Sequence, residues 1–207
     1  NFSTCHDTWL GPYGRMVSSN IYYQVCSDLI AEVIELFDGP RFFHLGMDEE
    51  TPQHQTHHEY AVIRQGDLWW RDLYFYMGQV EKKGARPWVW SDYVWHHPDL
   101  FYEKMPRSVL QSNWYYYESF STSPRVNWRA ARVKAYAELA ARGYDLVPTG
   151  SNYVYPENFQ DTVDFCRKKV PADRLCGFMQ STWQPTLKQE RQTHIEAIER
   201  VGRAIAG

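Results

Sequence analysis

Long apolar runs and an excess of positive charge are both missing from this sequence. No stretch reaches the roughly 18 consecutive apolar residues that a membrane-spanning helix needs, so no membrane partner is expected. Lysine and arginine number 22 against 25 aspartate and glutamate residues, which gives a net charge of −3. Because no basic run could follow a phosphate backbone, nucleic acid is not expected as a partner either.

Cysteine is also scarce, with four residues in 207 and no C-x-x-C pair. This spacing predicts no structural metal site. Four thiols over this length do not make a disulfide framework, so either redox compartment stays open. His54, His57 and His58 resemble a metal-ligand cluster in composition, but their polar, aperiodic setting favours the rim of a loop.

Aromatic residues are abundant instead, at 16% of the chain with nine tryptophans and fifteen tyrosines. Many stand beside polar residues rather than inside apolar runs. Flat rings next to hydrogen-bonding groups suit the apolar faces and hydroxyl rims of sugars. Packing in an aromatic core is the alternative, and composition alone leaves both open.

Short apolar runs alternate with longer segments of helical period along the whole chain, which is typical of successive βα units around a parallel sheet. We expect strands at residues 1–4, 41–45, 86–92, 108–113, 145–149 and 175–180. We expect helices at residues 21–37, 68–83, 99–104, 127–142, 156–169 and 187–206. The apolar stripe of the first helix is predicted at Val25, Leu29, Val33, Leu36 and Phe37, and that of the last helix at Ile195, Ile198, Val201 and Ile205.

The expected fold class is α/β, as a TIM-type (β/α)8 barrel of which about six βα units lie in this chain. Residues 1–207 would then form a single, partial barrel domain. Six strands could also form an open doubly wound sheet, whereas a closed barrel needs eight. Residues 1–4 resemble the end of a strand with nothing before it, which favours the barrel. We therefore expect an upstream segment of the same protein, or a second chain, to complete it.

The sharpest chemical feature is the segment FFHLGMDEE at residues 42–50, where a predicted strand runs through Gly46 into three acids. At the carboxyl end of a barrel strand, side chains converge on the site common to this architecture. A close pair such as Asp48 and Glu49 should raise the pKa of one member by mutual repulsion. One neutral acid beside one charged carboxylate is the arrangement that glycoside cleavage requires. The alternative is that the acids simply begin a solvated helix.

The same segment resembles the H-x-G-G-D-E signature of the family 20 glycoside hydrolases, the β-N-acetylhexosaminidases. His44, Gly46, Asp48 and Glu49 match this signature, and Met47 replaces its second glycine. In that family the aspartate and glutamate are the catalytic pair. The resemblance makes Asp48 and Glu49 the expected catalytic residues and His44 a substrate-site residue, while Glu50 is expected to start a helix or to support the pair.

Four further segments resemble the family's later strands, in the order of the chain. They are residues 88–92 with Trp90 and Asp92, residues 111–114 with Trp114, residues 151–153 with Tyr153, and residues 177–183 with Trp183. Tyr115 and Tyr116 compete with Tyr153 for the role of the tyrosine that contacts the substrate acetamide. The acid that commonly follows the last tryptophan is Gln184 here. Asp92 could instead cap the segment that follows it.

The resemblance implies a substrate-assisted retaining mechanism on terminal N-acetylhexosamines, without metal or organic cofactor. Glu49 would protonate the glycosidic oxygen, and Asp48 would hold the acetamide N–H so that the acetamide oxygen attacks the anomeric carbon. Tyr153 or Tyr115 would contact that oxygen, and Trp90, Trp114 and Trp183 would wall the sugar.

His6 is a weaker candidate for binding substrate hydroxyls, because a local hydrogen-bonded turn in Cys5-His6-Asp7 accounts for it equally well. Two departures bear on the substrate: the family's sugar-gripping arginine belongs to a first strand that this chain lacks, and Met47 and Gln184 differ from the family. Two other functions stay open. One is a carbohydrate-binding barrel without turnover, and the other is a retaining glycosidase with a carboxylate nucleophile.

Overall fold

The computed structural model describes residues 17–54, 56, 63–64 and 66–206. The chain divides into two compact units, Asn1–Val89 and Trp90–Gly207. The strand predicted at residues 1–4 and the candidate residue His6 lie outside the described residues. The single domain predicted from the sequence stays a prediction, and each unit is described by itself.

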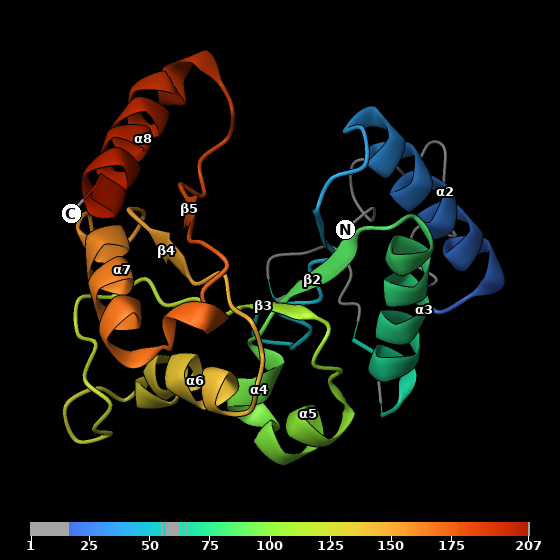
Figure 1. Cartoon of the computed structure of the whole chain (residues 1–207), viewed down its shortest axis with the longest axis horizontal. Coiled ribbons are helices and arrows are strands. Elements are labelled where there is room, and N and C mark those ends of the chain that lie inside the picture. Colours follow the sequence, from blue (N-terminus) through green and yellow to red (C-terminus); the bar gives the residue numbers. More distant parts are fainter. Residues whose placement is uncertain (1–16, 55, 57–62, 65, 207) are drawn as a thin grey trace. The chain divides into compact units, whose positions relative to one another are not determined.

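The first unit contains two helices and two parallel strands. They are α2 (Asn20–Leu36), β1 (Phe42–His44), α3 (Leu68–Lys82) and β2 (Arg86–Trp90), whose last residue opens the second unit. The Ser19 hydroxyl caps α2 by accepting the backbone N–H of Tyr22, as expected for an N-cap serine. Helices α2 and α3 pack side by side (Figure 1). Strand β1 pairs with β2 in the register Phe42 to Arg86 and His44 to Trp88.

The helix predicted at residues 21–37 is confirmed, but its predicted stripe is wrong, because Val25, Leu29 and Val33 are only half-buried and Leu36 and Phe37 are exposed. The buried side chains of α2 are Tyr22, Cys26, Ile30 and Ile34. Leu36 and Phe37 are 74% and 72% exposed. Apolar spacing alone gives a stripe that Leu36 and Phe37 also satisfy. The buried face of α2 instead consists of residues spaced by four positions, and Ile34 is the last of them. Leu36 and Phe37 follow this last buried residue and are therefore exposed.

The second unit contains the remaining helices and strands. In chain order they are α4 (Tyr93–His96), α5 (Pro98–Lys104), β3 (Leu110–Ser112), α6 (Ala130–Ala141), β4 (Thr149–Ser151), α7 (Asn158–Lys169), η2 (Ala172–Arg174), β5 (Met179–Ser181), η3 (Lys188–Glu190) and α8 (Arg191–Ala206). The short helix α4 was not predicted. It ends before His97, and α5 begins at Pro98, a favoured first helical residue because its missing N–H needs no partner there.

Successive strands of the second unit pair in parallel, in the order of the chain. Gln111 bridges to Leu146, Leu146 bridges to Leu175, and β4 pairs with β5. The strands are shorter than predicted, and the strand predicted at residues 145–149 is observed as β4 at Thr149–Ser151, directly after Pro148. Proline has no N–H to donate, and the regular pairing of β4 begins only after it. The described residues hold five strands, and the alternation of strands and helices agrees with the predicted βα order.

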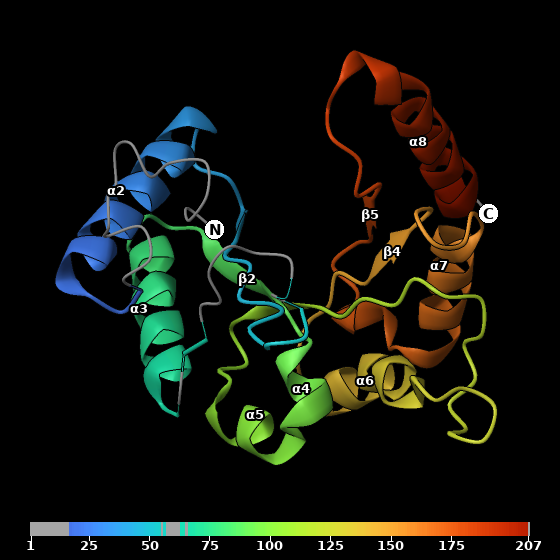
Figure 2. The same ribbon diagram turned by 180° about the vertical axis from the view of Figure 1, so that it is seen from behind.

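Helices α7 and α8 are in contact, and in both views the C-terminal end of α8 meets α7 (Figures 1 and 2). Phe159, Val163 and Ala204 form their buried core, with Val201 packed against it. The predicted stripe of α8 is wrong for Ile198 and Ile205, which are 71% and 45% exposed. The buried positions of α8 are the alanines Ala197 and Ala204, since a small side chain lets two helices approach closely.

None of the helices within the described part of the chain is long and apolar enough to span a membrane.

Candidate functional site

A strained turn carries the two acids. It spans residues 46–51, directly after β1, and is called the acid turn below. Gly46, Met47 and Glu49 have φ angles of 75°, 72° and 56°. Only glycine adopts such left-handed backbone without steric penalty. The family signature has glycine where Met47 stands, and the backbone here keeps a glycine-like conformation with methionine in place. No helix begins at the acids, so the reading of residues 48–50 as a helix start is wrong.

The two carboxylates lie in different environments. Asp48 is half-buried, and burial raises the pKa of its carboxyl, with the neighbouring charge of Glu49 raising it further. The Glu49 side chain is 45% exposed, and its Oε1 lies 3.8 Å from Nε2 of His54. The sequence predicted that repulsion would raise the pKa of one acid. The pKa of Asp48 is indeed raised, but burial of the carboxyl contributes more to the rise than the charge of Glu49 does.

His44 supports the acid turn. Its Nδ1 accepts a hydrogen bond from the backbone N–H of Gly46 at 3.0 Å, which places the proton of the neutral ring on Nε2. The ring packs edge-on against Trp88 at 4.7 Å between centroids. Burial lowers the pKa of the imidazole to about 4. His44 is therefore neutral at pH 7, and one of its two nitrogens is engaged with the backbone of the turn.

In the second unit, the tryptophans predicted from three separate segments come together. The Trp90 and Trp183 rings lie 6.1 Å apart, and Trp183 lies 6.2 Å from Tyr116. Tyr116 stacks on Trp114 at 5.1 Å, and Trp114 meets Trp95 edge-on at 4.6 Å. We call these five residues the aromatic cluster. It joins Trp90, Trp114 and Trp183, as expected of residues that follow neighbouring parallel strands.

Trp95 of the cluster and the neighbouring Arg132 were not singled out from the sequence. Arg132 of α6 lies over the Trp95 ring at 4.4 Å and the Trp114 ring at 5.2 Å, a cation–π arrangement. Asn113 accepts from Trp95 Nε1 at 2.8 Å and donates to the Arg132 carbonyl at 2.8 Å. The sequence gives no signal for these contacts beyond the position of Trp95 after a predicted strand; Arg132 lies within the predicted helix at residues 127–142. Trp183 remains 50% exposed at the edge of the cluster, with a φ of 51°.

The structure separates the three candidate tyrosines, of which Tyr116 is buried against Trp114 in the aromatic cluster. Tyr115 is 1% exposed, and its hydroxyl donates to the Ser119 carbonyl at 2.8 Å and accepts from the Asn127 amide at 2.9 Å. Tyr153 is 60% exposed, and its backbone N–H donates to Ser151 Oγ at 3.0 Å. A substrate can therefore reach the Tyr153 side chain, whereas the Tyr115 hydroxyl is committed to its own loop.

Asp92 is half-buried and immediately precedes α4. Its side chain makes no capping hydrogen bond to that helix, so the capping alternative is not supported. His57 and His58 lie outside the described residues. Within the described residues, no group of His, Cys, Asp and Glu side chains could hold a metal ion.

Parallel strands with polar and aromatic residues after their carboxyl ends define an α/β protein of the kind that binds ligands at one edge of its sheet. The family follows from the whole sequence. The sequence model of the family described as "Glycosyl hydrolase family 20, catalytic domain" matches residues 12–201. The chain therefore belongs to this family, which implies a TIM-barrel fold.

The chain is also similar in structure to a solved GH20 exo-β-N-acetylglucosaminidase from Vibrio harveyi, crystallised in complex with N-acetylglucosamine. The TM-score is 0.56 at 16% sequence identity, and the likeness covers 88% of this chain and 30% of that one. This chain thus spans less than a third of the length of that protein, and the likeness concerns the fold. No curated protein sequence matches the chain.

Proposed function

We propose that this chain belongs to a glycoside hydrolase that removes terminal N-acetylhexosamine residues by a substrate-assisted retaining mechanism. The observation that supports it most is the acid turn. Within the segment matched by the family, two adjacent carboxylates follow β1, one shielded from water and the other exposed to it.

Glu49 is the proposed proton donor. Its side chain is 45% exposed, so its carboxyl can reach the glycosidic oxygen of a bound sugar. Protonation of that oxygen lets the leaving group depart as an alcohol while the acetamide oxygen bonds to the anomeric carbon. Water then opens the resulting ring, and Glu49 takes up the proton of that water.

Asp48 is the proposed partner of the acetamide N–H. Burial disfavours the charged form of its carboxyl. A hydrogen bond from the acetamide N–H favours that charged form and offsets the burial. Such a contact also turns the acetamide oxygen toward the anomeric carbon. Binding of an N-acetylated sugar would thus be coupled to ionisation of Asp48, which supports an acetamido sugar over a plain hexose.

The second unit supplies residues suited to hold the sugar. Trp90, Trp114 and Trp183 of the aromatic cluster are proposed to pack against the apolar faces of the sugar ring and acetamide. Tyr153 is proposed to donate its hydroxyl to the acetamide oxygen, in preference to Tyr115, because only Tyr153 is exposed. Asp92 is proposed to accept sugar hydroxyls.

The proposal is tested with Glu49→Gln and two substrates. N,N′-diacetylchitobiose has a poor leaving group and needs the proton, whereas a dinitrophenyl N-acetylglucosaminide has a good one. We expect Glu49→Gln to lower kcat on the disaccharide by about 10²–10⁴-fold and on the dinitrophenyl substrate by much less. Glu103→Gln, an exposed glutamate on α5, is the matched control. Unchanged hydrolysis of the disaccharide by Glu49→Gln would refute the assignment.

A thiazoline analogue of the cyclised intermediate distinguishes the two retaining mechanisms. Tight inhibition supports attack by the acetamide. Trapping of a glycosyl group on a carboxylate of the protein, without thiazoline inhibition, would instead establish an enzymatic nucleophile. Sugar binding with no hydrolysis of either substrate would establish a carbohydrate-binding protein.

A further inference from the structure

A buried group of charges lies beside the acid turn, in the first unit. Arg64 stands between two carboxylates: its Nη1 contacts Glu50 Oε1, and its Nε lies 2.7 Å from Asp72 Oδ2. The backbone N–H of Arg64 also donates to Glu50 Oε2 at 3.3 Å. The Arg64 side chain is 8% exposed, that of Glu50 18% and that of Asp72 0%. We call Glu50, Arg64 and Asp72 the buried charge group.

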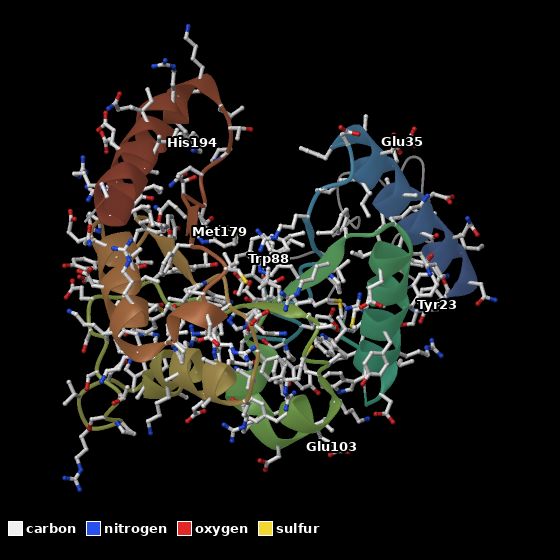
Figure 3. The ribbon with its side chains drawn as sticks, viewed as in Figure 1. Tyr23, Glu35, Trp88, Glu103, Met179 and His194 are labelled. Carbon is white, nitrogen blue, oxygen red and sulfur yellow. The ribbon has the colours of Figure 1, made fainter. Side chains whose placement is uncertain are left out.

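The Asp72 end of this group is fixed by two helices. Asp72 lies on α3 and accepts hydrogen bonds from Ser18 Oγ, at 2.6 Å, and from the Tyr23 hydroxyl of α2. Tyr23 in turn stacks on Phe75 of α3 at 4.3 Å, and Figure 3 shows Tyr23 on the side of α2 that meets α3. Arg64 is therefore held on a carboxylate that the helix pair immobilises.

The Glu50 end belongs to the acid turn, which has no regular secondary structure of its own. Left-handed backbone at Met47 and Glu49 is unfavourable and persists only where surrounding contacts enforce it. Glu50 is joined to Glu49 by one rigid peptide unit, so any shift of Glu50 moves the backbone of Glu49. Arg64 Nη1 also lies 3.9 Å from Met47 Sδ, on the other side of the two acids in sequence.

We propose that the buried charge group anchors the acid turn to α3, so that Glu50 and Arg64 are positioning residues for the proton donor Glu49. This inference rests on the proposed function of Glu49. Arg64 also neutralises the third consecutive acid, which would otherwise add its charge to the pair. Removing Arg64 leaves two buried carboxylates without their cation, and removing Glu50 detaches the acid turn from Arg64, so in either case the turn can shift.

The experiment compares Glu50→Ala, Glu50→Gln and Arg64→Met in the intact protein on the same two substrates. A displacement of about 1 Å can lower a rate about 100-fold. We expect Glu50→Ala to lower kcat on N,N′-diacetylchitobiose by about that factor, with KM changed less than about threefold, and to affect the dinitrophenyl substrate far less. Glu50→Gln keeps the shape and one hydrogen bond to Arg64, so a loss of about tenfold is expected.

Asp145→Asn is the matched control. It breaks the ion pair with Arg174, at 3.1 Å, outside the acid turn, and both kinetic constants should stay unchanged. A structural defect alone would lower the rates on both substrates equally, by lowering the amount of folded protein. Such equal loss in Glu50→Ala, or a kcat within twofold of wild type, would overturn the proposal.

A second measurement separates this inference from the proposed function. If the wild-type protein hydrolyses neither substrate, the proposed function fails, and amide hydrogen exchange then tests the anchor. Faster exchange at residues 46–51 in Glu50→Ala than in Asp145→Asn supports the anchor. Equal exchange in the two variants refutes it.

Discussion

Lowering the pH should destabilise the protein through one residue, His44. Burial lowers the pKa of its imidazole from 6.5 to about 4. The unfolded chain therefore takes up a proton before the folded chain does. The stabilising contribution of neutral, buried His44 is fully present above pH 6.5 and is lost as the pH falls through about 4. One unit of pKa corresponds to about 1.4 kcal/mol, so the shift of the His44 pKa from 6.5 to about 4 corresponds to roughly 3 kcal/mol of unfolding free energy.

The assay is urea unfolding of the wild-type protein and of His44→Asn at several pH values between 7 and 4.5. Asparagine does not titrate, and its Oδ1 can accept the Gly46 N–H in place of Nδ1. We expect the free energy of unfolding of wild type, relative to this variant, to fall by about 1.4 kcal/mol per pH unit below pH 6.

Asp48 contributes with the opposite sign, and the comparison removes that contribution. Burial raises the pKa of Asp48, so its contribution favours the folded state at low pH and is lost as the pH rises through the folded pKa. This background is common to both proteins, whereas the His44 contribution is present only in wild type. Parallel stability curves for the two proteins, or an imidazole that titrates near pH 6.5 by NMR, would refute the reasoning.

Three further substitutions test the geometry. Met47→Gly should be more stable to urea than Met47→Ala by about 1 kcal/mol, because the φ of 72° favours glycine; the reverse order would contradict the strain. Gly150→Ala should lower the unfolding free energy by about 1–3 kcal/mol, because its Cβ would lie 2.9 Å from Phe159 Cα. Unchanged stability in urea would show that β4 and α7 can move apart at this contact without cost. His194→Ala removes the contacts with Thr182 and Pro185 that flank Trp183, so KM should rise roughly tenfold, or about 1.4 kcal/mol, at similar kcat; an unchanged KM would argue against this role.

The helices were predictable because their signals are local. The apolar period and the Asp38-Gly39-Pro40 segment that stops the helix predict residues 21–37, within one residue of the observed bounds of α2 at each end. Which side of each helix becomes buried is not local. Ile198 satisfies the apolar period of α8 yet is exposed, whereas Ala197 and Ala204 are buried and Ala204 packs with Phe159 and Val163 of α7. The sequence pattern weights large apolar residues and misses such contacts.

In the candidate site, too, the residues marked by a local motif were predictable and those joined by tertiary packing were not. The family signature spans residues 44–49 and places the two acids side by side after a predicted strand, so a local motif was enough to find Asp48 and Glu49. The contact between Glu50 and Arg64 crosses 14 positions, and no motif marks it. The aromatic cluster was predicted in part, since Trp90, Trp114 and Trp183 lie at or after the ends of separate strands, whereas the contact of Arg132 with Trp114 depends on tertiary packing alone.

Burial of the Met47 side chain accounts for a methionine at a position of the acid turn whose backbone favours glycine. Left-handed backbone costs a non-glycine residue about 1–2 kcal/mol. The Met47 side chain is 8% exposed, and burying a methionine contributes about 1.5–3 kcal/mol. The two effects nearly cancel, so methionine can keep the conformation that glycine would adopt freely. The turn is then held by side chains on both sides, with His44 on the Gly46 N–H and Arg64 on Glu50. A turn fixed in this way depends on those side chains more than a turn with two glycines would. Substitution of His44 or Arg64 should therefore disturb the acids more in wild type than in a Met47→Gly background.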